Sequence, residues 1–147
     1  MANQQQLDLL MQGVATAWNT WRDEHPDTPI RLNGADLSEA NLGEVNLARA
    51  DLSLANLSRA DLNNANLSQA RLAQADLSGA NLAEADLSDA DLREASLSHA
   101  DFNGADLTGA NLQGADLREA LLEEATLEGA LITPEQLSQA KVGPDGL

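Results

Sequence analysis

Leucine, or a residue close to it, recurs at every fifth position from Leu32 to Ile132, and this period limits what the chain can fold into. Of the 21 positions in the series, only Phe102 and Ile132 are not leucine. In an α-helix a step of five residues turns the side chain by about 140°, so the leucines would point all around the helix. In a flat strand an odd step alternates between the two faces. Only a chain that bends at each repeat can bury all of these leucines.

Small and polar residues accompany the leucines in a fixed order. Alanine usually stands two residues before the leucine, with Asp or Asn between them, as in Ala35-Asp36-Leu37. This A-(D/N)-L-x-x pattern resembles the pentapeptide repeat family over residues 30–134. The resemblance implies an all-β solenoid, a right-handed quadrilateral β-helix with four repeats in each 20-residue coil. It would have about five coils, and with strands near 4.8 Å apart it would form a rod about 25 Å long.

A coil of 20 residues predicts vertical columns of side chains. The outward positions 20 residues apart should stack, and in most columns neutral or basic residues then separate the carboxylates, as like-charge repulsion requires. Asp86 over Asp106 is the exception. We also expect a hydrogen-bonding ladder of hydroxyl groups along one column, which contains Ser38, Ser58, Ser78 and Ser98.

The segment before the repeats, residues 1–29, shows helical periodicity instead. We expect one amphipathic helix over residues 5–24 that ends before His25-Pro26. Its apolar stripe would contain Leu7, Leu10, Met11, Val14, Ala17, Trp18 and Trp21. A stacked coil has an open strand edge at each end, so we interpret this helix as a cap on the first coil. The alternative is a helix that binds a partner or a membrane, but its polar face lacks the Lys and Arg of such helices.

A second helix is predicted after the repeats, in the C-terminal segment 135–147. Thr133-Pro134-Glu135-Gln136 has the sequence of a helix start, with an N-cap threonine, a first-turn proline and a reciprocal glutamine. We expect a short helix over about 134–140 with Leu137 facing inward. The residues from 141 to 147 are expected to form a frayed tail.

Two leucines near this end occupy outward positions that are polar elsewhere, namely Leu121 and Leu131. Either the terminal helix or a second molecule should cover them. The family resemblance implies a homodimer through the C-terminal end, as in the quinolone-resistance members. We therefore expect a monomer or a homodimer with this contact.

The net charge of −16 narrows the choice of partners. A strongly acidic surface repels nucleic acid and anionic membranes, so direct binding to either is not expected. A protein with a basic surface or cleft is the expected partner. Because the first residues lack the pattern of a signal peptide and no apolar stretch is long enough to span a membrane, we expect a cytoplasmic protein.

No constellation of residues suited to catalysis is evident, so we predict a non-enzymatic protein without cofactors. There is no cysteine, and of the two histidines only His99 follows a serine, Ser98, in an extended segment where neighbours point apart. A cluster of Asp86, Asp89 and Asp106 could attract a divalent cation. A flat ladder offers fewer oxygens than the six or more that calcium needs, so we interpret these residues as a solvated face and predict no metal site.

Sorting the outward charges by the side of the coil identifies one acidic side without a single base. It holds six carboxylates, which form the candidate interaction face: Glu44, Asp61, Glu84, Asp101, Glu123 and Glu124. The opposite side has three acids and three arginines, so it is neutral. We predict a scaffold that binds a protein partner through its acidic side.

The alternative is a DNA mimic that occupies the DNA saddle of a type II topoisomerase such as gyrase, or another DNA-binding protein, as the family resemblance implies. The repeats carry 18 acids against six arginines. Duplex DNA of the same length, about 25 Å, carries roughly 15 charges, so the charge density permits mimicry.

Overall fold

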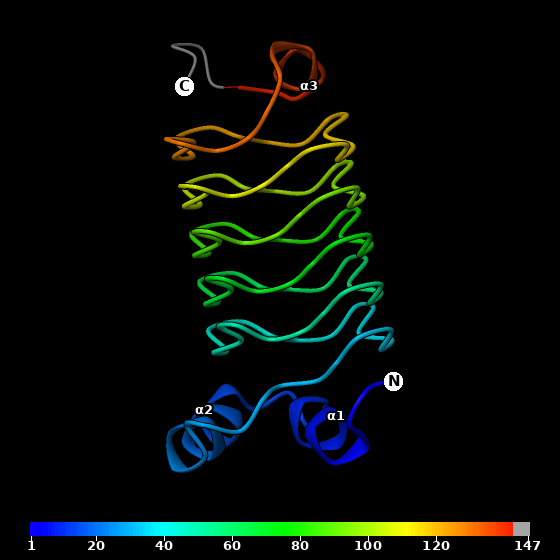
Figure 1. Cartoon of the computed structure of the whole chain (residues 1–147), viewed down its shortest axis with the longest axis vertical. Coiled ribbons are helices and arrows are strands. Elements are labelled where there is room, and N and C mark those ends of the chain that lie inside the picture. The colour runs from blue at the N-terminus through cyan, green and yellow to red at the C-terminus, as the bar shows by residue number, and fades with distance from the viewer. Residues whose placement is uncertain (143–147) are drawn as a thin grey trace.

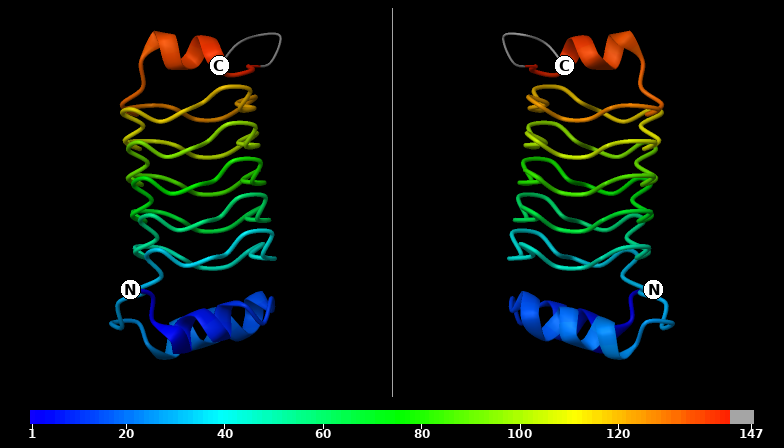
Figure 2. Two further views of the ribbon diagram at one scale, coloured as in Figure 1. Left: turned by 90° about the vertical axis from the view of Figure 1, so that its right-hand side faces the viewer. Right: turned by 90° about the vertical axis from the view of Figure 1, so that its left-hand side faces the viewer.

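A computed structural model describes residues 1–142 of the chain as a stack of coils with helices at both ends. Two helices, α1 (Gln4–Leu10) and α2 (Ala15–Glu24), lie below the first coil, and α3 (Pro134–Gln139) lies above the last (Figure 1). The two side views in Figure 2 show the repeats between them as flat coils of similar size. The architecture is therefore a capped solenoid.

The register of the stack is 20 residues. Parallel bridges join residues 20 apart along the whole stack, from Arg31 paired with Asp51 to Asn111 paired with Leu131. This register agrees with the expected four repeats per coil. In the described part of the chain these pairings are isolated bridges rather than longer strands, because the chain turns again within each repeat.

The core is the column of leucines and alanines inside the coils. The central residues from Leu32 to Leu122 are at most 1% exposed, and Phe102 is fully buried among them. The alanines two residues before them are buried as well, as Ala50 and Ala100 illustrate. Burial of each leucine contributes roughly 2 kcal/mol, so the repeats form a stable core almost without aromatic rings.

Each corner of the coil is a tight turn that needs an unusual backbone conformation. The first is closed by a hydrogen bond of 3.0 Å from Ala35 N–H to the Leu32 carbonyl. The residue before the alanine has a positive φ, and glycine fills this turn position at Gly34 and Gly104. At 14 corners the residue is not glycine. A side chain in this left-handed region costs on the order of 1 kcal/mol.

The Asp or Asn before each leucine also has a local role. Its Oδ1 accepts the backbone N–H two residues later, at 3.1 Å from Asp36 to Ser38 and at 3.0 Å from Asn56 to Ser58. The serine hydroxyl donates to the same oxygen at 2.7 Å in both repeats. The expectation of a hydroxyl ladder was therefore wrong for Ser38, Ser58 and Ser78, because their hydroxyls bond within their own repeat.

The N-terminal segment is not the single helix that its periodicity predicts. Residues from Met11 to Val14 separate α1 from α2, and Gly13 adopts a φ of 71° there, which a continuous helix does not allow. Met11 and Val14 were expected on the buried stripe, but they are 48% and 50% exposed. The break lets the two helices reach different corners of the first coil.

Polar side chains of α1 and α2 bind the open edge of this coil. Gln6 accepts from Arg31 N–H at 2.8 Å. On the other side, the indole of Trp18 donates to the Asn46 carbonyl at 2.8 Å, and Arg22 donates to the same oxygen at 2.9 Å. These bonds satisfy backbone groups that would otherwise form an unpaired strand edge.

At the other end α3 begins with the expected capping box between Thr133 and Gln136. Leu137 is half-buried against the core, as predicted. Lys141 does not belong to a frayed tail, because it forms a bridge with Leu121 and accepts Leu122 N–H at 2.8 Å. The part of the predicted tail from 143 to 147 lies outside the described residues.

Candidate interaction surfaces

The six carboxylates of the candidate acidic face come from one side of successive coils. Asp61 and Asp101 belong to one bridged column, in which Asn81 stands between them and donates to Asp61 at 3.4 Å. Glu44, Glu84 and Glu124 follow at the corners, with φ values of 64°, 60° and 61°. The remaining member, Glu123, precedes Glu124 in the chain.

The acidic face has no ion pair among the residues that the structure describes. Among residues 1–142 the ion pairs are Arg59–Glu39, Arg93–Asp91, Arg118–Asp116 and Lys141–Glu119, at 2.6 to 2.7 Å. None includes a member of the acidic face. Lys141 stacks on the column of Asp101 and Leu121, but its amine turns to Glu119 on the neighbouring side. The six carboxylates are thus left without a cation.

The fold itself does not require these charges. In the same column as Asp61, the neutral Asn81 makes the same bond to the N–H two residues later, at 3.0 Å compared with 3.1 Å for Asp61. At the corners, Gly104 stands in the position that Glu84 fills one coil earlier. A Cβ on Gly104 would collide with the Glu84 carboxylate, so this side chain lies directly against the next corner. Neutral residues therefore serve the same structural roles on this side.

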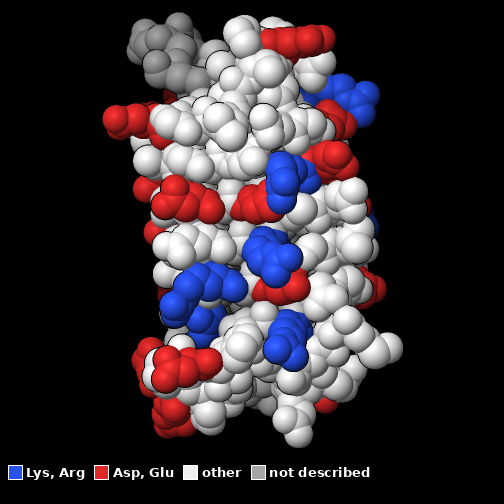
Figure 3. Space-filling view, in the orientation of Figure 1, with Lys and Arg blue, Asp and Glu red and all other residues white. Residues whose placement is uncertain are grey.

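On the opposite side the charges alternate. The bridged column there contains Arg31, Asp51, Arg71 and Asp91. Figure 3 shows a side of the rod on which basic and acidic side chains alternate along its length in this manner. The pKa of Asp91 is lowered, first by the hydrogen bond from the Arg93 side chain; burial opposes this, and the charge of Arg71 in the column lowers the pKa a little further. This side is neutral in total, and its acids and bases alternate along the column.

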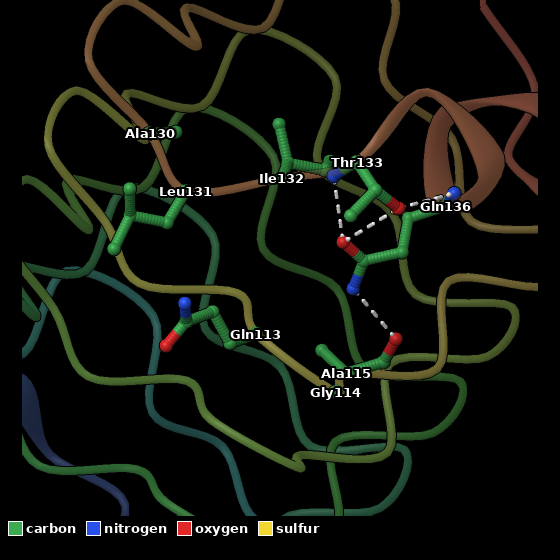
Figure 4. Close-up of a pocket in the computed structure, with 8 residues that line it drawn as sticks. All are labelled: Gln113, Gly114, Ala115, Ala130, Leu131, Ile132, Thr133 and Gln136. Atoms are coloured by element: carbon green, nitrogen blue, oxygen red, sulfur yellow. Dashed lines mark hydrogen bonds between the residues drawn. The ribbon is translucent and has the colours of Figure 1, made fainter.

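The two leucines of the candidate C-terminal contact lie in different environments. Leu121 is half-buried beneath the strand segment at Lys141, whereas Leu131 is 50% exposed. Leu131 borders a shallow hollow of about 540 Å³, whose lining also includes Ala130, Ile132 and Gln136 (Figure 4). Gln136 donates to the Ala115 carbonyl at 3.0 Å and thereby ties α3 to the coil below. The terminal helix thus leaves Leu131 uncovered.

The described residues hold no cluster of three or more acidic, histidine or cysteine side chains placed to bind a metal. Asp86 and Asp106 do stack as expected, but each Oδ1 accepts a backbone N–H of its own repeat at 2.9 Å. Asp89 lies against Gly109 of the next coil. Within residues 1–142 there is also no helix long and apolar enough to cross a membrane.

The sequence reasoning missed the polar side chains that hold the N-terminal cap. Gln6 and Arg22 are only 4% and 7% exposed, although both residue types are normally found at the surface. The burial of Arg22 could have been predicted from the sequence, because Arg22 follows the apolar Trp18 by four residues and therefore lies on the same side of the helix. Asn19 bonds the first coil twice, and its place next to Trp18 gives no such signal.

Comparison with known proteins shows a match to one protein family. The family model described as Pentapeptide repeats matches residues 30–69, 70–109 and 96–133, with eight copies. No curated protein sequence matches the chain.

Several solved structures are similar to it. A pentapeptide repeat protein from Nostoc is 36% identical, with 74% of this chain and 84% of that one covered and a TM-score of 0.54. A pentapeptide repeat protein from the Arabidopsis thaliana thylakoid lumen is 28% identical, with 73% and 74% covered and a TM-score of 0.58. QnrB1, a plasmid-mediated fluoroquinolone resistance protein, is 20% identical over 71% of this chain and 68% of that one, with a TM-score of 0.29. The similarity to QnrB1 is too low to support a functional argument.

Proposed function

Because the chain belongs to the pentapeptide repeat family, whose repeats fill residues 30–133, we propose that it is a non-enzymatic scaffold that binds a protein partner through its acidic face. One observation carries the proposal. Six carboxylates stand on one side of the rod without a cation, in positions where the same fold accepts Asn or Gly. Charges that the fold does not need, and that repel one another, are explained by a partner that neutralises them.

The partner expected from this surface is a protein with a basic groove or strip. The coils are stacked about 4.8 Å apart, and Glu44, Glu84 and Glu124 stand on every second coil, so these carboxylates recur about every 10 Å and present a regular row to extended or flat basic surfaces. Association with such a surface gains speed and specificity from complementary charge, and both fall as salt screens the interaction. We propose a cytoplasmic setting for this encounter, which remains a prediction from the sequence.

A test can use variants that differ only in where charge is removed. Asp61→Asn, Glu84→Gln and Asp101→Asn remove three of the six charges of the acidic face, whereas Asp86→Asn, Asp89→Asn and Asp106→Asn remove the same charge from a neighbouring side. Each protein is immobilised and used to capture partners from cells of its own host at low and high salt. We expect a partner that the wild type and the control triple retain at low salt and the acidic-face triple loses. Equal recovery by all three proteins would exclude the acidic face as the binding surface.

DNA mimicry is the second candidate function, and the charge of the repeats favours it. Its 18 acids against six arginines give a density close to that of a duplex of equal length, about 15 charges in 25 Å. We propose that the partner in this case is a DNA-binding protein with a basic saddle, such as gyrase. Purified gyrase should then bind the chain at low salt, compete with DNA, and lose affinity when Glu84 and Asp101 are changed to Lys. If gyrase does not bind the chain at low salt, gyrase is excluded as the partner of a DNA mimic.

A contact between two copies through the C-terminal end is a separate proposal. The exposed Leu131, beside an apolar hollow, supports it more than the half-buried Leu121 does. Sedimentation of the wild type over a range of concentrations should show dimers. Leu131→Glu should dissociate them, and Leu54→Glu, a control at another exposed leucine, should not. A wild type that stays monomeric at all concentrations would contradict the proposal.

A further inference from the structure

A hollow of about 310 Å³ lies beside the N-terminal cap, between the end of α2, the loop after it and a corner of the first coil. Two arginines line it, Arg22 from α2 and Arg49 from the corner, together with the hydroxyl-bearing Thr28 and with Asp27. This grouping of bases contrasts with the rest of a chain that has 24 acids and only eight bases.

Arg22 is buried, and its positive charge has no ion-pair partner among residues 1–142. Its Nη1 donates to the Asn46 carbonyl at 2.9 Å and its Nη2 to the Ala48 carbonyl at 3.0 Å, which fixes the plane of the guanidinium group. Carbonyl oxygens supply partial charges only. Burial is the strongest influence lowering the pKa of Arg22, the nearby Arg49 lowers it further, and Asp23 acts in the opposite direction. The charge is therefore held at a cost.

Arg22 also retains donor capacity. Its Nε has no hydrogen-bond partner among residues 1–142, and no buried side-chain nitrogen or oxygen there is unsatisfied, so this nitrogen is not fully buried. A guanidinium group offers five N–H donors in a fixed plane, of which two are used here. A further acceptor can bind without disturbing the cap.

Arg49 adds a second charge from a strained position. Its φ is 62°, in the left-handed region where glycine is preferred, and its side chain is exposed at the corner. Neither Arg49 nor Arg22 takes part in any of the four ion pairs of the described residues. Two neighbouring guanidinium groups without a carboxylate partner repel each other, so an anion between them would relieve the repulsion.

We propose that this hollow binds an oxyanion group, a phosphate or a carboxylate, through Arg22 and Arg49. Both groups match the planar fork of a guanidinium, which binds two oxygens at once. The Thr28 hydroxyl lies in the same lining and can donate a further hydrogen bond. Asp27 disfavours an anion near its own carboxylate, so the bound group should lie on the arginine side of the hollow. The inference does not depend on the acidic face, which lies on another side of the coil.

Backbone amide NMR of the full chain can test the site with two probes, inorganic phosphate and succinate, at constant ionic strength. We expect saturable shifts at the amides of Arg22, Thr28 and Arg49. Arg49→Gln should weaken binding of the better probe about tenfold or more, because one charged hydrogen bond is lost. Arg71→Gln, which removes an unpaired base from the neutral side, should leave binding unchanged.

The two probes separate the possible sources of the oxyanion. If the shifts saturate with phosphate alone, a phosphate group is supported as the natural ligand. If they saturate with succinate at least as readily as with phosphate, a carboxylate is supported. Shifts that fail to saturate with both probes overturn the proposal. So does an equal loss of affinity in Arg49→Gln and Arg71→Gln, because binding would then follow total charge rather than this hollow.

Discussion

The three glutamates at the corners of the acidic face allow the cost of these charges to be measured. We consider the replacement of Glu44, Glu84 and Glu124 by glycine. All three have φ values between 60° and 64°, close to the 73° that Gly104 adopts at the equivalent corner. Glycine can occupy this region without strain, so the substitution should leave the turn unchanged.

The expected gain follows from two opposing effects. Strain at a non-glycine residue in the left-handed region costs about 1–2 kcal/mol, whereas glycine loses about 0.4–1 kcal/mol more backbone entropy on folding. The net gain is about 0.8 kcal/mol per corner, or about 2 kcal/mol for three. For a chain of this size each kcal/mol raises the melting temperature by about 2–4 °C, so we expect an increase of about 4–8 °C. Removal of three like charges from a chain of net charge −16 acts in the same direction.

Thermal unfolding followed by circular dichroism, with chemical denaturation as a second measurement, tests this expectation. Gln69→Gly is the matched control, because its φ is 57° at a corner of another side, its side chain makes no hydrogen bond within residues 1–142, and no charge changes. Its melting temperature should rise only by the amount that the balance of backbone strain and backbone entropy at one corner provides. If the triple variant melts below the wild type, the corners do not store the strain that we infer. If it is stabilised and also loses its partner, the glutamates are retained for binding at the expense of stability.

Three further predictions concern the core, the cap and the pH dependence. Leu77→Asp should unfold the repeats, because a carboxylate in a fully buried position costs several kcal/mol. Leu54→Asp, at a position that is 65% exposed, should melt like the wild type. Equal melting temperatures of the two variants would contradict the assignment of Leu77 to the inside and Leu54 to the outside. Arg22→Ala should lower the free energy of unfolding, measured with denaturant, by about 2–4 kcal/mol and should speed amide exchange in the first coil, because the Ala48 carbonyl loses its donor. Arg71→Ala, the control, should change both quantities little. The pKa values of Asp91 and Asp116 are lowered, first by hydrogen bonds from Arg93 and Arg118, so their contribution is present at neutral pH and is lost as the pH falls below about 5. The double variant Asp91→Asn, Asp116→Asn should therefore lose less stability than the wild type between about pH 5 and pH 2, as acid titration of the unfolding midpoint would show.

The repeat interior could be predicted from the sequence because one period governs it. A leucine every fifth residue has a single solution in which all are buried, and the stacking of Asp86 over Asp106 followed once the coil length was taken from the family. The grouping of Glu84 and Asp101 on one side needs only the same register. Because these features repeat, the position of each residue in the coil is predicted by the equivalent residues of many other repeats.

The ends could not be predicted to the same extent, because nothing there repeats. Helical periodicity located the N-terminal helices but joined them across Gly13, whose positive φ depends on how each helix meets the coil. Buried polar side chains such as Gln6 and Arg22 are explained by the backbone groups that they satisfy, and those groups are known only once the coil is built. The unpaired arginines beside the cap became visible for the same reason.

Salt should act in opposite directions on the two kinds of association proposed for this chain. A copy of the chain carries a net charge of −16, so two copies repel each other, and an apolar contact at Leu131 must overcome that repulsion. Because the Debye length falls from about 10 Å at 0.1 M salt to about 3 Å at 1 M, dimers should become more stable as salt is added. Binding of a basic partner to the acidic face gains from the same field and should weaken. An assembly strengthened by salt would therefore be assigned to the C-terminal end, and one weakened by salt to the acidic face.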